Sequence, residues 1–375
     1  MRTAGAEEEH EREEALHRSS VARDRRRGTR VRRMDFEKRR ANARARARLS
    51  AAVRRLLGEG GYEEVETPSL VPAPGMEPHI QAFEAPFVPE GGGAAVPLFL
   101  HSSPEYAMKR LLAEGFDRIF QLSRVFRNGE VSATHNPEFT LLELYRTGTD
   151  YRGVMADVER VLEGCARALL GGGTRAVRGA RAVDLRAPFE TLTVQEAFLR
   201  YARVDLAACD GRAERLVEAA RSAGHDPGPG GESFDDVFFR VMLNAVEPRL
   251  GAERPTWLVD WPASMAALSK VKRDDPRWAE RFELYAGGLE LANGFTELND
   301  AVEQRARLVE EQALRGRLGR RVYPLDEAFL AAVGRMPDAG GVAIGLDRLL
   351  MLLVGAKSIE EVLLFPASGF PGVGA

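Results

Sequence analysis

The feature that most limits how this chain can fold is a pair of strand-like segments, residues 119–126 and 140–145, separated by a polar loop. Runs of β-branched and aromatic residues that border asparagine, glycine and proline are typical of paired strands. A hairpin is also predicted at residues 282–295, with its turn at Gly287 and Gly288. Strand and helix signals follow one another in mixed order. This favours an α+β fold, with an antiparallel sheet flanked by helices, over a doubly wound sheet.

The remaining elements are predicted from local composition and from turn-forming residues. Helices are expected over residues 35–57, 300–320 and 347–353, and strands over residues 62–67, 257–260 and 341–345. The first helix is expected to be closed by Gly58, Gly60 and Gly61. Two glycine-rich segments, residues 171–173 and 225–231, have the composition of linkers and bracket a helical insertion near residues 185–255.

Residues 1–33 contain almost no large apolar side chains, and an acidic cluster is followed there by an arginine-rich one. Such a segment cannot bury enough surface to offset the entropy of ordering it, so a disordered charged tail is predicted. An RNA-binding arm is the alternative, and Met34 is a candidate for the true start of translation. Residues 34–375 are predicted to form the folded domain.

The charge balance and the cysteine content exclude several classes of protein. The formal net charge of the 375 residues is −3, which argues against binding nucleic acid through a bulk positive field. Only Cys165 and Cys209 occur, without clustered histidines, so zinc fingers are excluded and a reducing compartment is indicated. No apolar run approaches the ~18 residues that a membrane span needs. A cytoplasmic protein without a membrane partner is expected.

Two arginines are the candidates for binding phosphate. The sequence has no GxxxxGK[ST] or GxGxxG loop, so phosphate must be held by side chains. Arg127 follows a predicted strand, and Arg348 begins the last predicted helix. Arginine grips phosphate oxygens through parallel hydrogen bonds and keeps its charge. Either arginine alone is more often a surface ion pair, so the assignment depends on the residues around it.

Three segments in order carry a resemblance to the class II aminoacyl-tRNA synthetases. Residues 124–145, with Phe-Arg-Asn-Gly-Glu and His-Asn-Pro-Glu-Phe, resemble the second signature motif in its lysine-specific form. Residues 341–351 resemble the third motif and residues 61–68 the first. The resemblance extends over nearly the whole chain from about residue 36. It implies the antiparallel synthetase fold, ATP-dependent activation of an amino acid, and a homodimer whose interface includes the first motif.

The resemblance places the ATP site in the second and third motifs. It implies that Arg127 holds the α-phosphate and Arg348 the γ-phosphate, as catalytic residues, while Phe139 stacks under adenine. The implied ATP-binding set is Arg127, Glu130, His135, Asn136, Phe139 and Arg348. Gly129 stands where the family usually has a glutamate, so Glu130, which follows it, is expected to make the contact with adenine instead.

Magnesium is implied as the cation that offsets the triphosphate charge, and it prefers carboxylates and water. If Gly287 and Gly288 form a two-residue turn, Tyr285 pairs with Glu290, and Glu283 then lies on the same face as Glu290. The resemblance points to these two glutamates as metal ligands. The alternative is that they are solvated side chains on an exposed sheet face.

The resemblance also implies a pocket for lysine. Its residues are Glu105, Glu143, Tyr145, Ala292, Asn293, Phe295 and Glu297. A ligand with two ammonium groups needs at least two carboxylates, because an unpaired buried cation is costly. Glu105 and Glu143 are expected to face the backbone end of lysine, and Glu297 its ε-ammonium. Strict strand alternation would separate Glu290 from this pocket, so an irregularity is expected near Gly294.

Within the family, the chain resembles a truncated branch that attaches (R)-β-lysine to a lysine side chain of translation elongation factor P. Full lysyl-tRNA synthetases place an anticodon-binding barrel ahead of this domain, and the residues before the first predicted helix leave no room for one. Ala292, where tRNA-charging enzymes have glycine, is expected to favour a β-amino over an α-amino group. The alternatives are a minimal enzyme that charges tRNA or another RNA, with tRNA the less expected partner, and a non-catalytic binding module.

Overall fold

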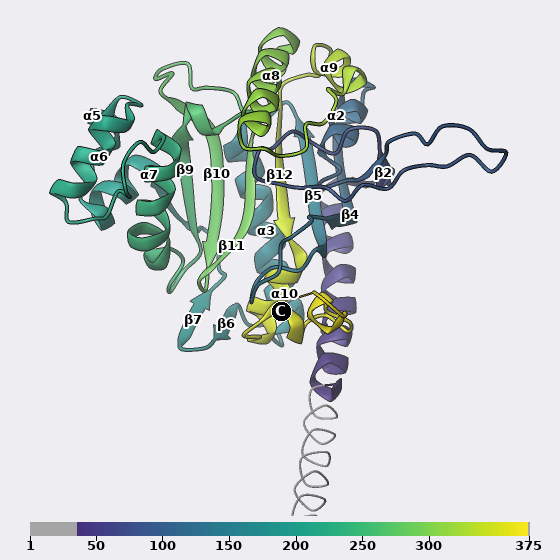
Figure 1. Ribbon diagram of the computed structural model, residues 1–375. Coiled ribbons are helices and arrows are strands. Elements are labelled where there is room, and N and C mark those ends of the chain that lie inside the picture. Colours follow the sequence, from purple (N-terminus) through teal and green to yellow (C-terminus); the bar gives the residue numbers. More distant parts are fainter. Residues whose placement is uncertain (1–35, 374–375) are drawn as a thin grey trace, which may run out of the picture.

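The computed structural model describes residues 36–373, which are organised around an eight-stranded sheet (Figure 1). From one edge to the other, its strands are β1 (Glu63–Glu64), β4 (Arg118–Phe126), β5 (Glu138–Thr147), β12 (Ala339–Gly345), β11 (Leu289–Thr296), β10 (Trp278–Ala286), β9 (Thr256–Pro262) and β8 (Glu190–Thr193). The two outer pairs are parallel, and all other neighbours are antiparallel. The predicted α+β fold with an antiparallel sheet is confirmed. The tail predicted at residues 1–33, and Met34, lie outside the described residues.

Three helices cover one face of the sheet and share an apolar core with its strands. They are the helix at residues 36–59, α3 (Tyr151–Leu169) and α10 (Leu346–Val354). Helix α3 was not predicted; it begins after Asp150, whose carboxylate accepts hydrogen bonds from the N–H groups of Arg152 and Gly153. The first helix runs two residues past its predicted end at Leu57, and the chain turns at Gly60, one of the glycines expected to close it.

Three other helices pack over the opposite face, at the top of the sheet in Figure 1. They are α2 (Glu105–Ala113), α8 (Ala301–Arg317) and α9 (Glu327–Val333). The rings of Tyr106 and Phe329 stack with their centroids 4.0 Å apart and join α2 to α9. Side chains of α2 and α8 contribute to the cavity described below, so these helices form part of its wall.

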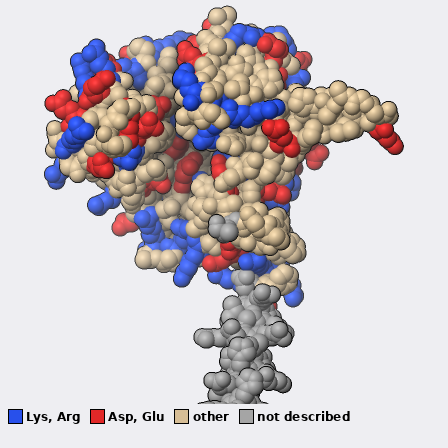
Figure 2. Space-filling model, viewed as in Figure 1, with Lys and Arg blue, Asp and Glu red and all other residues tan. Residues whose placement is uncertain are grey.

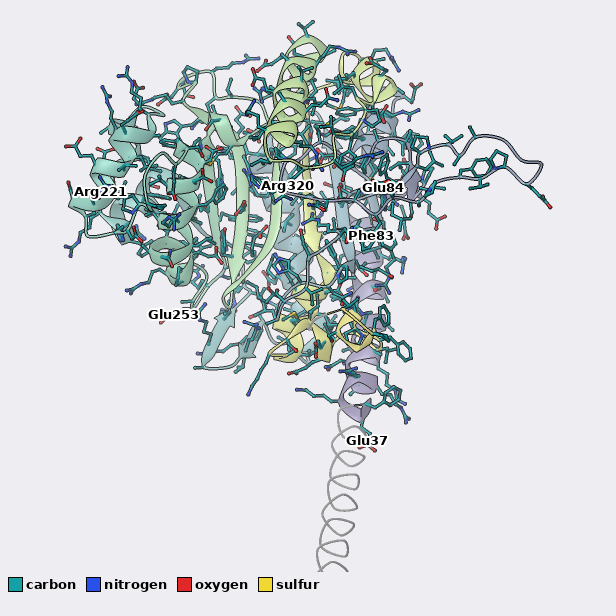
Figure 3. All side chains as sticks on the ribbon, viewed as in Figure 1. Glu37, Phe83, Glu84, Arg221, Glu253 and Arg320 are labelled. Atoms are coloured by element: carbon teal, nitrogen blue, oxygen red, sulfur yellow. The ribbon has the colours of Figure 1, made fainter. Side chains whose placement is uncertain are left out.

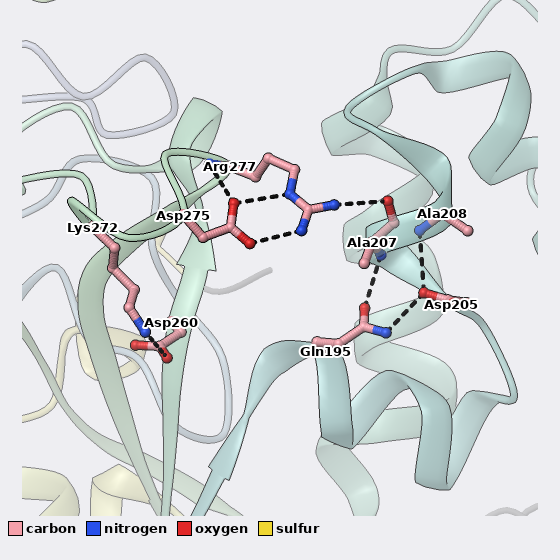
Figure 4. Close-up of polar contacts among 8 residues, drawn as sticks. All are labelled: Gln195, Asp205, Ala207, Ala208, Asp260, Lys272, Asp275 and Arg277. Carbon is pink, nitrogen blue, oxygen red and sulfur yellow. Dashed lines mark hydrogen bonds and ion pairs between the residues drawn. The ribbon is translucent and has the colours of Figure 1, made fainter.

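Four short helices lie between β8 and β9 along the chain and enclose a separate apolar cluster. They are α4 (Val194–Ala197), α5 (Leu206–Cys209), α6 (Ala213–Ser222) and α7 (Phe234–Val241). Figure 4 shows how the loop before β10 is tied to them: Arg277 pairs with Asp275 at 2.7 Å and donates to the carbonyl oxygen of Ala207 at 3.3 Å. Residues 225–231 lie between α6 and α7, inside this helical region rather than at its border.

An arm projects from the side of the molecule, beyond the pair formed by β2 (Leu70–Val71) and β3 (Phe99–Leu100) (Figure 1). Figure 3 places Phe83 and Glu84 at its base. A smaller hairpin, made of β6 (Arg175–Arg178) and β7 (Arg181–Asp184), packs on α10. Among residues 36–373, no helix combines the length and the apolar character needed to cross a membrane.

Candidate functional site

One cavity of about 370 Å³ gathers nearly all of the predicted site residues. From that set, its lining includes Glu105, Arg127, Glu130, His135, Asn136, Phe139, Glu143, Tyr145, Glu290, Ala292, Asn293, Phe295, Glu297 and Arg348. Glu283 is the predicted residue that does not line it. Figure 2 shows acidic side chains in the hollow at the centre of this face, with lysines and arginines above it.

The β10–β11 hairpin brings the metal and pocket residues onto one face. Tyr285 pairs with Glu290, as the two-residue turn predicts, but Leu284 pairs with Ala292, so Leu291 is an extra, bulged residue. The bulge shifts the alternation by one residue, so the pocket residues beyond it share the face of Glu290. The irregularity predicted near Gly294 therefore lies earlier, at Leu291.

Gly294 has a different structural reason to be glycine. It pairs in regular register with Phe282 on β10 and Val342 on β12. A Cβ atom there would lie 2.4 Å from the carbonyl oxygen of Gly341 and 2.5 Å from the Phe282 ring. Close packing of the strands, rather than a change of register, therefore requires glycine at this position.

Ala292 is next to the bulge, where the two faces of the strand meet. It lines the cavity, yet it pairs with Leu284 and Ile344 and belongs to the apolar core beneath the sheet. Only 2% of its surface is exposed. The register therefore turns its methyl group toward the core, and any effect of Ala292 on the ligand has to act through the backbone of the bulge.

Three carboxylates form the anionic end of the cavity: Glu105, Glu143 and Glu297. Glu143 accepts hydrogen bonds from Ser103 Oγ at 2.6 Å and from the Tyr145 hydroxyl at 3.0 Å. Burial, followed by repulsion from Glu105, raises the pKa of Glu143 to about 8. Burial also raises the pKa of Glu297 to about 8. This end of the cavity therefore favours a cationic ligand.

A buried cation that the sequence analysis missed, Lys109, lies behind this anionic end. Its Nζ is 2.6 Å from Glu105 Oε1 and 2.5 Å from Glu297 Oε2, and only 1% of its side chain is exposed. Burial opposes the charged form, but Glu105 and Glu297 together raise the pKa of Lys109. The spacing of Glu105 and Lys109 by four residues would have been the available signal, had a helix been predicted there.

The opposite end of the cavity is cationic. Arg348 donates from Nη1 to the carbonyl oxygen of Glu290 at 2.9 Å and to its carboxylate at 3.2 Å, while its Nη2 lies 2.7 Å from His135 Nε2. Burial and the neighbouring Arg348 lower the pKa of His135, so a neutral ring accepts that hydrogen bond. The guanidinium of Arg127 lies 5.1 Å from the centre of the Phe139 ring, and its buried Nε has no hydrogen-bond partner among residues 36–373.

The loop between β4 and β5 determines how the second-motif residues enter the cavity. Gly129 has a φ of +85°, a left-handed conformation that side chains rarely adopt, and Glu130 lines the cavity directly after it. Asn136 uses both ends of its amide to hold the loop: it donates to the carbonyl oxygen of Glu138 at 2.6 Å and accepts from the Ala367 N–H at 2.9 Å.

Glu283 lies beside the cavity, on the same hairpin face as Glu290. Its carboxylate accepts from Arg281 Nη2 at 2.7 Å and from the Tyr285 hydroxyl at 2.6 Å. Burial, and then repulsion from Glu290, raises its pKa to about 7. The described part of the chain has no group of three or more His, Cys, Asp or Glu side chains arranged for a metal. Two neighbouring carboxylates fit Mg²⁺ only if ligand oxygens complete its shell.

Two further acids in the cavity, Glu77 and Glu311, were also missed, because they are far apart in sequence and meet only in the fold. Burial, followed by repulsion from Glu77, raises the pKa of Glu311 to about 8. Burial and repulsion from Glu105 raise the pKa of Glu77. The cavity is therefore more acidic than the predicted residues alone indicated.

Comparison with known families matches residues 22–369 to the family described as tRNA synthetases class II (D, K and N). The chain is 39% identical over 327 residues to the elongation factor P–(R)-beta-lysine ligase of Proteus mirabilis, covering 87% of this chain and 95% of that protein. It is 39% identical over 322 residues to the ligase of the same name from Salmonella typhi, covering 85% and 93%. The ligase of Edwardsiella ictaluri is 39% identical over 326 residues, covering 87% and 94%.

Proposed function

Because the chain belongs to the class II tRNA synthetases, we propose that it uses ATP to activate lysine or (R)-β-lysine and transfers it to a lysine side chain of translation elongation factor P. The observation that carries this proposal is a single cavity that joins three carboxylates, of which Glu143 and Glu297 are fully buried, to two arginines. Such a cavity suits a ligand with ammonium groups at one end and phosphate at the other. Because elongation factor P takes part in translation, we infer that the enzyme acts in the cytoplasm.

In the first step, the carboxylate of the amino acid attacks the α-phosphorus of ATP, the bond to the β-phosphate breaks, and pyrophosphate leaves. Arg127, whose buried Nε has no hydrogen-bond partner within residues 36–373, is available for the α-phosphate, and Arg348 for the γ-phosphate. Two arginines at opposite ends of a triphosphate hold it in line and stabilise the charge that develops. In this arrangement, Glu105 and Glu143 bind the amino group at the backbone end of the amino acid, and Glu297 binds its ε-ammonium.

The second step forms an amide and needs no nucleophile from the protein. The ε-amine of the acceptor lysine attacks the carbonyl carbon of the adenylate, the bond to the phosphate oxygen breaks, and AMP leaves with the amine having lost a proton. Phe139 and Glu130 both line the cavity, and we assign Phe139 to stacking against adenine and Glu130 to a contact with the base. We assign Mg²⁺ to Glu283 and Glu290, where it would neutralise charge on the triphosphate.

The acceptor is tested by offering labelled lysine and (R)-β-lysine, with ATP, to purified elongation factor P and separately to total tRNA. We expect label on the factor and none on tRNA. Label on tRNA alone would replace this proposal with that of a minimal tRNA-charging enzyme. Absence of transfer to either acceptor, together with absence of lysine-dependent pyrophosphate exchange, would leave a binding module.

We also propose that the chain forms a homodimer. Apolar side chains are exposed on the arm and near the C-terminus, including Phe87 at 53%, Val88 at 64%, Phe365 at 79% and Phe370 at 55%. A groove of about 600 Å³ between the first helix and the C-terminal segment is lined largely by apolar residues. A second copy of the chain would cover these surfaces. Light scattering after size exclusion tests the proposal, and a monomer at micromolar concentration would contradict it.

A further inference from the structure

The buried charges at the anionic end do not balance without a ligand. Glu105, Glu143 and Glu297 supply three carboxylates, and Lys109 is the one ammonium that forms ion pairs with any of them in the described part of the chain. Buried charges are stable only when they are paired, so the remaining negative charge has to be protonated or matched by a ligand. Two further positive charges would complete the set.

Lys109 is placed to be a permanent part of the wall rather than a stand-in for the ligand. It is absent from the cavity lining and reaches Glu105 and Glu297 from α2, on the far side of the carboxylates. Its Nζ also lies 5.0 Å from the centre of the Phe295 ring and 6.0 Å from that of Phe329. Ligand binding therefore does not need to displace it.

We propose that Lys109 is a positioning residue that sets the charge of the pocket: it bridges Glu105 and Glu297, and it leaves Glu105, Glu143 and Glu297 together with a deficit of two positive charges. The ligand class that meets this deficit is an amino acid with two ammonium groups, which includes both lysine and β-lysine. The inference deepens the proposed function and rests on it for the identity of the substrate.

The titratable groups around Lys109 determine how its loss would appear. Glu105 and Glu297 contact it, Glu143 and Tyr145 face it from β5, and Glu77 and Glu311 lie farther along the cavity. Lys109 lowers the pKa of Glu143 and of Glu297 against the effect of burial. Without Lys109, both would hold their protons to a higher pH, and a protonated carboxyl cannot pair with an ammonium group.

The test compares Lys109→Met, which keeps the length of the side chain, with Lys109→Arg, which keeps the charge. In lysine-dependent ATP–pyrophosphate exchange, we expect Lys109→Met to raise the KM for lysine or β-lysine at least about tenfold and to change kcat less. We also expect the acid limb of kcat/KM to move to higher pH. Lys109→Arg should restore both values in part. Arg110→Met removes an exposed positive charge from the same helix and should change neither.

A purely structural role would lower the melting temperature of Lys109→Met without moving the acid limb, and that result would overturn the inference. Calorimetric binding of 1,5-diaminopentane, a dication that cannot be activated, gives a second readout. If the wild type does not activate lysine but binds the diamine in a Lys109-dependent way, the proposed function fails and the charge-setting role stands. If lysine is activated and Lys109→Met behaves like Arg110→Met, the inference fails alone.

Discussion

Without a ligand, the charged side chains at the two ends of the cavity form ion pairs that differ in burial. At the cationic end, Arg348 pairs with Glu290, and their side chains are 21% and 38% exposed. At the anionic end, Lys109 pairs with Glu297, and their side chains are 1% and 0% exposed. An exposed pair is worth little and can exchange partners when phosphate and a metal bind, whereas a buried pair is costly to break. The first pair is suited to rearrange and the second to stay.

This difference suggests a division of labour. Under the proposed function, the partly exposed arginine end would meet a ligand whose charge is redistributed during the reaction, so its contacts would contribute most in the transition state. The buried carboxylate end would meet ammonium groups that keep their charge in the first step, so its contacts would contribute to binding and selectivity. Substitutions at the two ends should therefore separate into effects on kcat and effects on KM and stability.

The largest effect is expected for Arg127→Ala at the cationic end. Loss of a positive charge at the α-phosphate should lower kcat for pyrophosphate exchange by about 10² to 10³, by analogy with the loss of other preorganised donors. Arg124→Ala is the matched control. The Arg124 side chain is 51% exposed and makes a long ion pair of 3.6 Å with Glu138, so its loss should leave the phosphate site unchanged. Equal activity of the two variants would show that Arg127 does not contact the reacting phosphate.

The next prediction compares the loss of folding stability caused by one substitution at each end of the cavity. Glu297→Gln removes one of the two carboxylates that pair with the buried Lys109 and should cost about 1 to 3 kcal/mol of unfolding free energy, because Glu105 alone then compensates the buried ammonium. Glu290→Gln removes the carboxylate of the exposed pair and should cost no more than about 1 kcal/mol. Urea unfolding of both variants measures the difference. Similar losses would contradict the distinction between a fixed and an exchangeable pair.

A smaller effect is expected on changing pH. The pKa values of Glu143 and Glu297 are about 8, against an ordinary value of 4.5, so the folded chain keeps protons that the unfolded chain has lost between pH 4.5 and 8. Stability should therefore fall as the pH rises through this window and level off above it. Lysine binding needs the ionised carboxylates, so its KM should fall as the pH rises from 6 to 8.

The same pH series sharpens the comparison if the KM for ATP is measured beside that for lysine. The pKa of His135 is lowered, so its ring stays neutral across this range and the cationic end should change little. Isothermal titration of lysine in buffers of different ionisation enthalpy should show protons released on binding. If the KM values for lysine and ATP follow pH in parallel, the two ends do not titrate separately.

Local sequence was enough to predict the parts of the fold that depend on local chemistry. The turn at Gly287 and Gly288 fixed the pairing of Tyr285 with Glu290, because a two-residue loop leaves one register. The bulge could not be placed in the same way, because Leu291 looks like any other strand residue and only the pairing of Leu284 with Ala292 reveals it. Sequence analysis therefore predicted that the alternation breaks, but not where.

The missed elements of the site have the same explanation. Nothing in the local sequence distinguishes Lys109 until the residue after β11 brings the Glu297 carboxylate to 2.5 Å from its Nζ. Glu77 and Glu311 join the cavity from a loop and from α8, and no local pattern connects them. The motif residues of the site could be predicted from the motifs themselves. The charged side chains that accompany them meet them only through tertiary packing, so they could not.

The smallest predicted effect concerns Gly129, at the exposed end of the cavity. Among the residues that the structure describes, no heavy atom lies within 4 Å of an ideal Cβ at Gly129, so Gly129→Ala should cost only the backbone strain of a left-handed residue, about 1 to 2 kcal/mol. Glu130→Gln leaves the backbone unchanged and tests the side chain alone. If Gly129 turns the loop so that Glu130 reaches adenine, both variants should raise the KM for ATP severalfold while the KM for lysine stays constant. A change in the KM for lysine of the same size would mean that the loop serves the whole cavity, and that the two ends are less independent than their burial indicates.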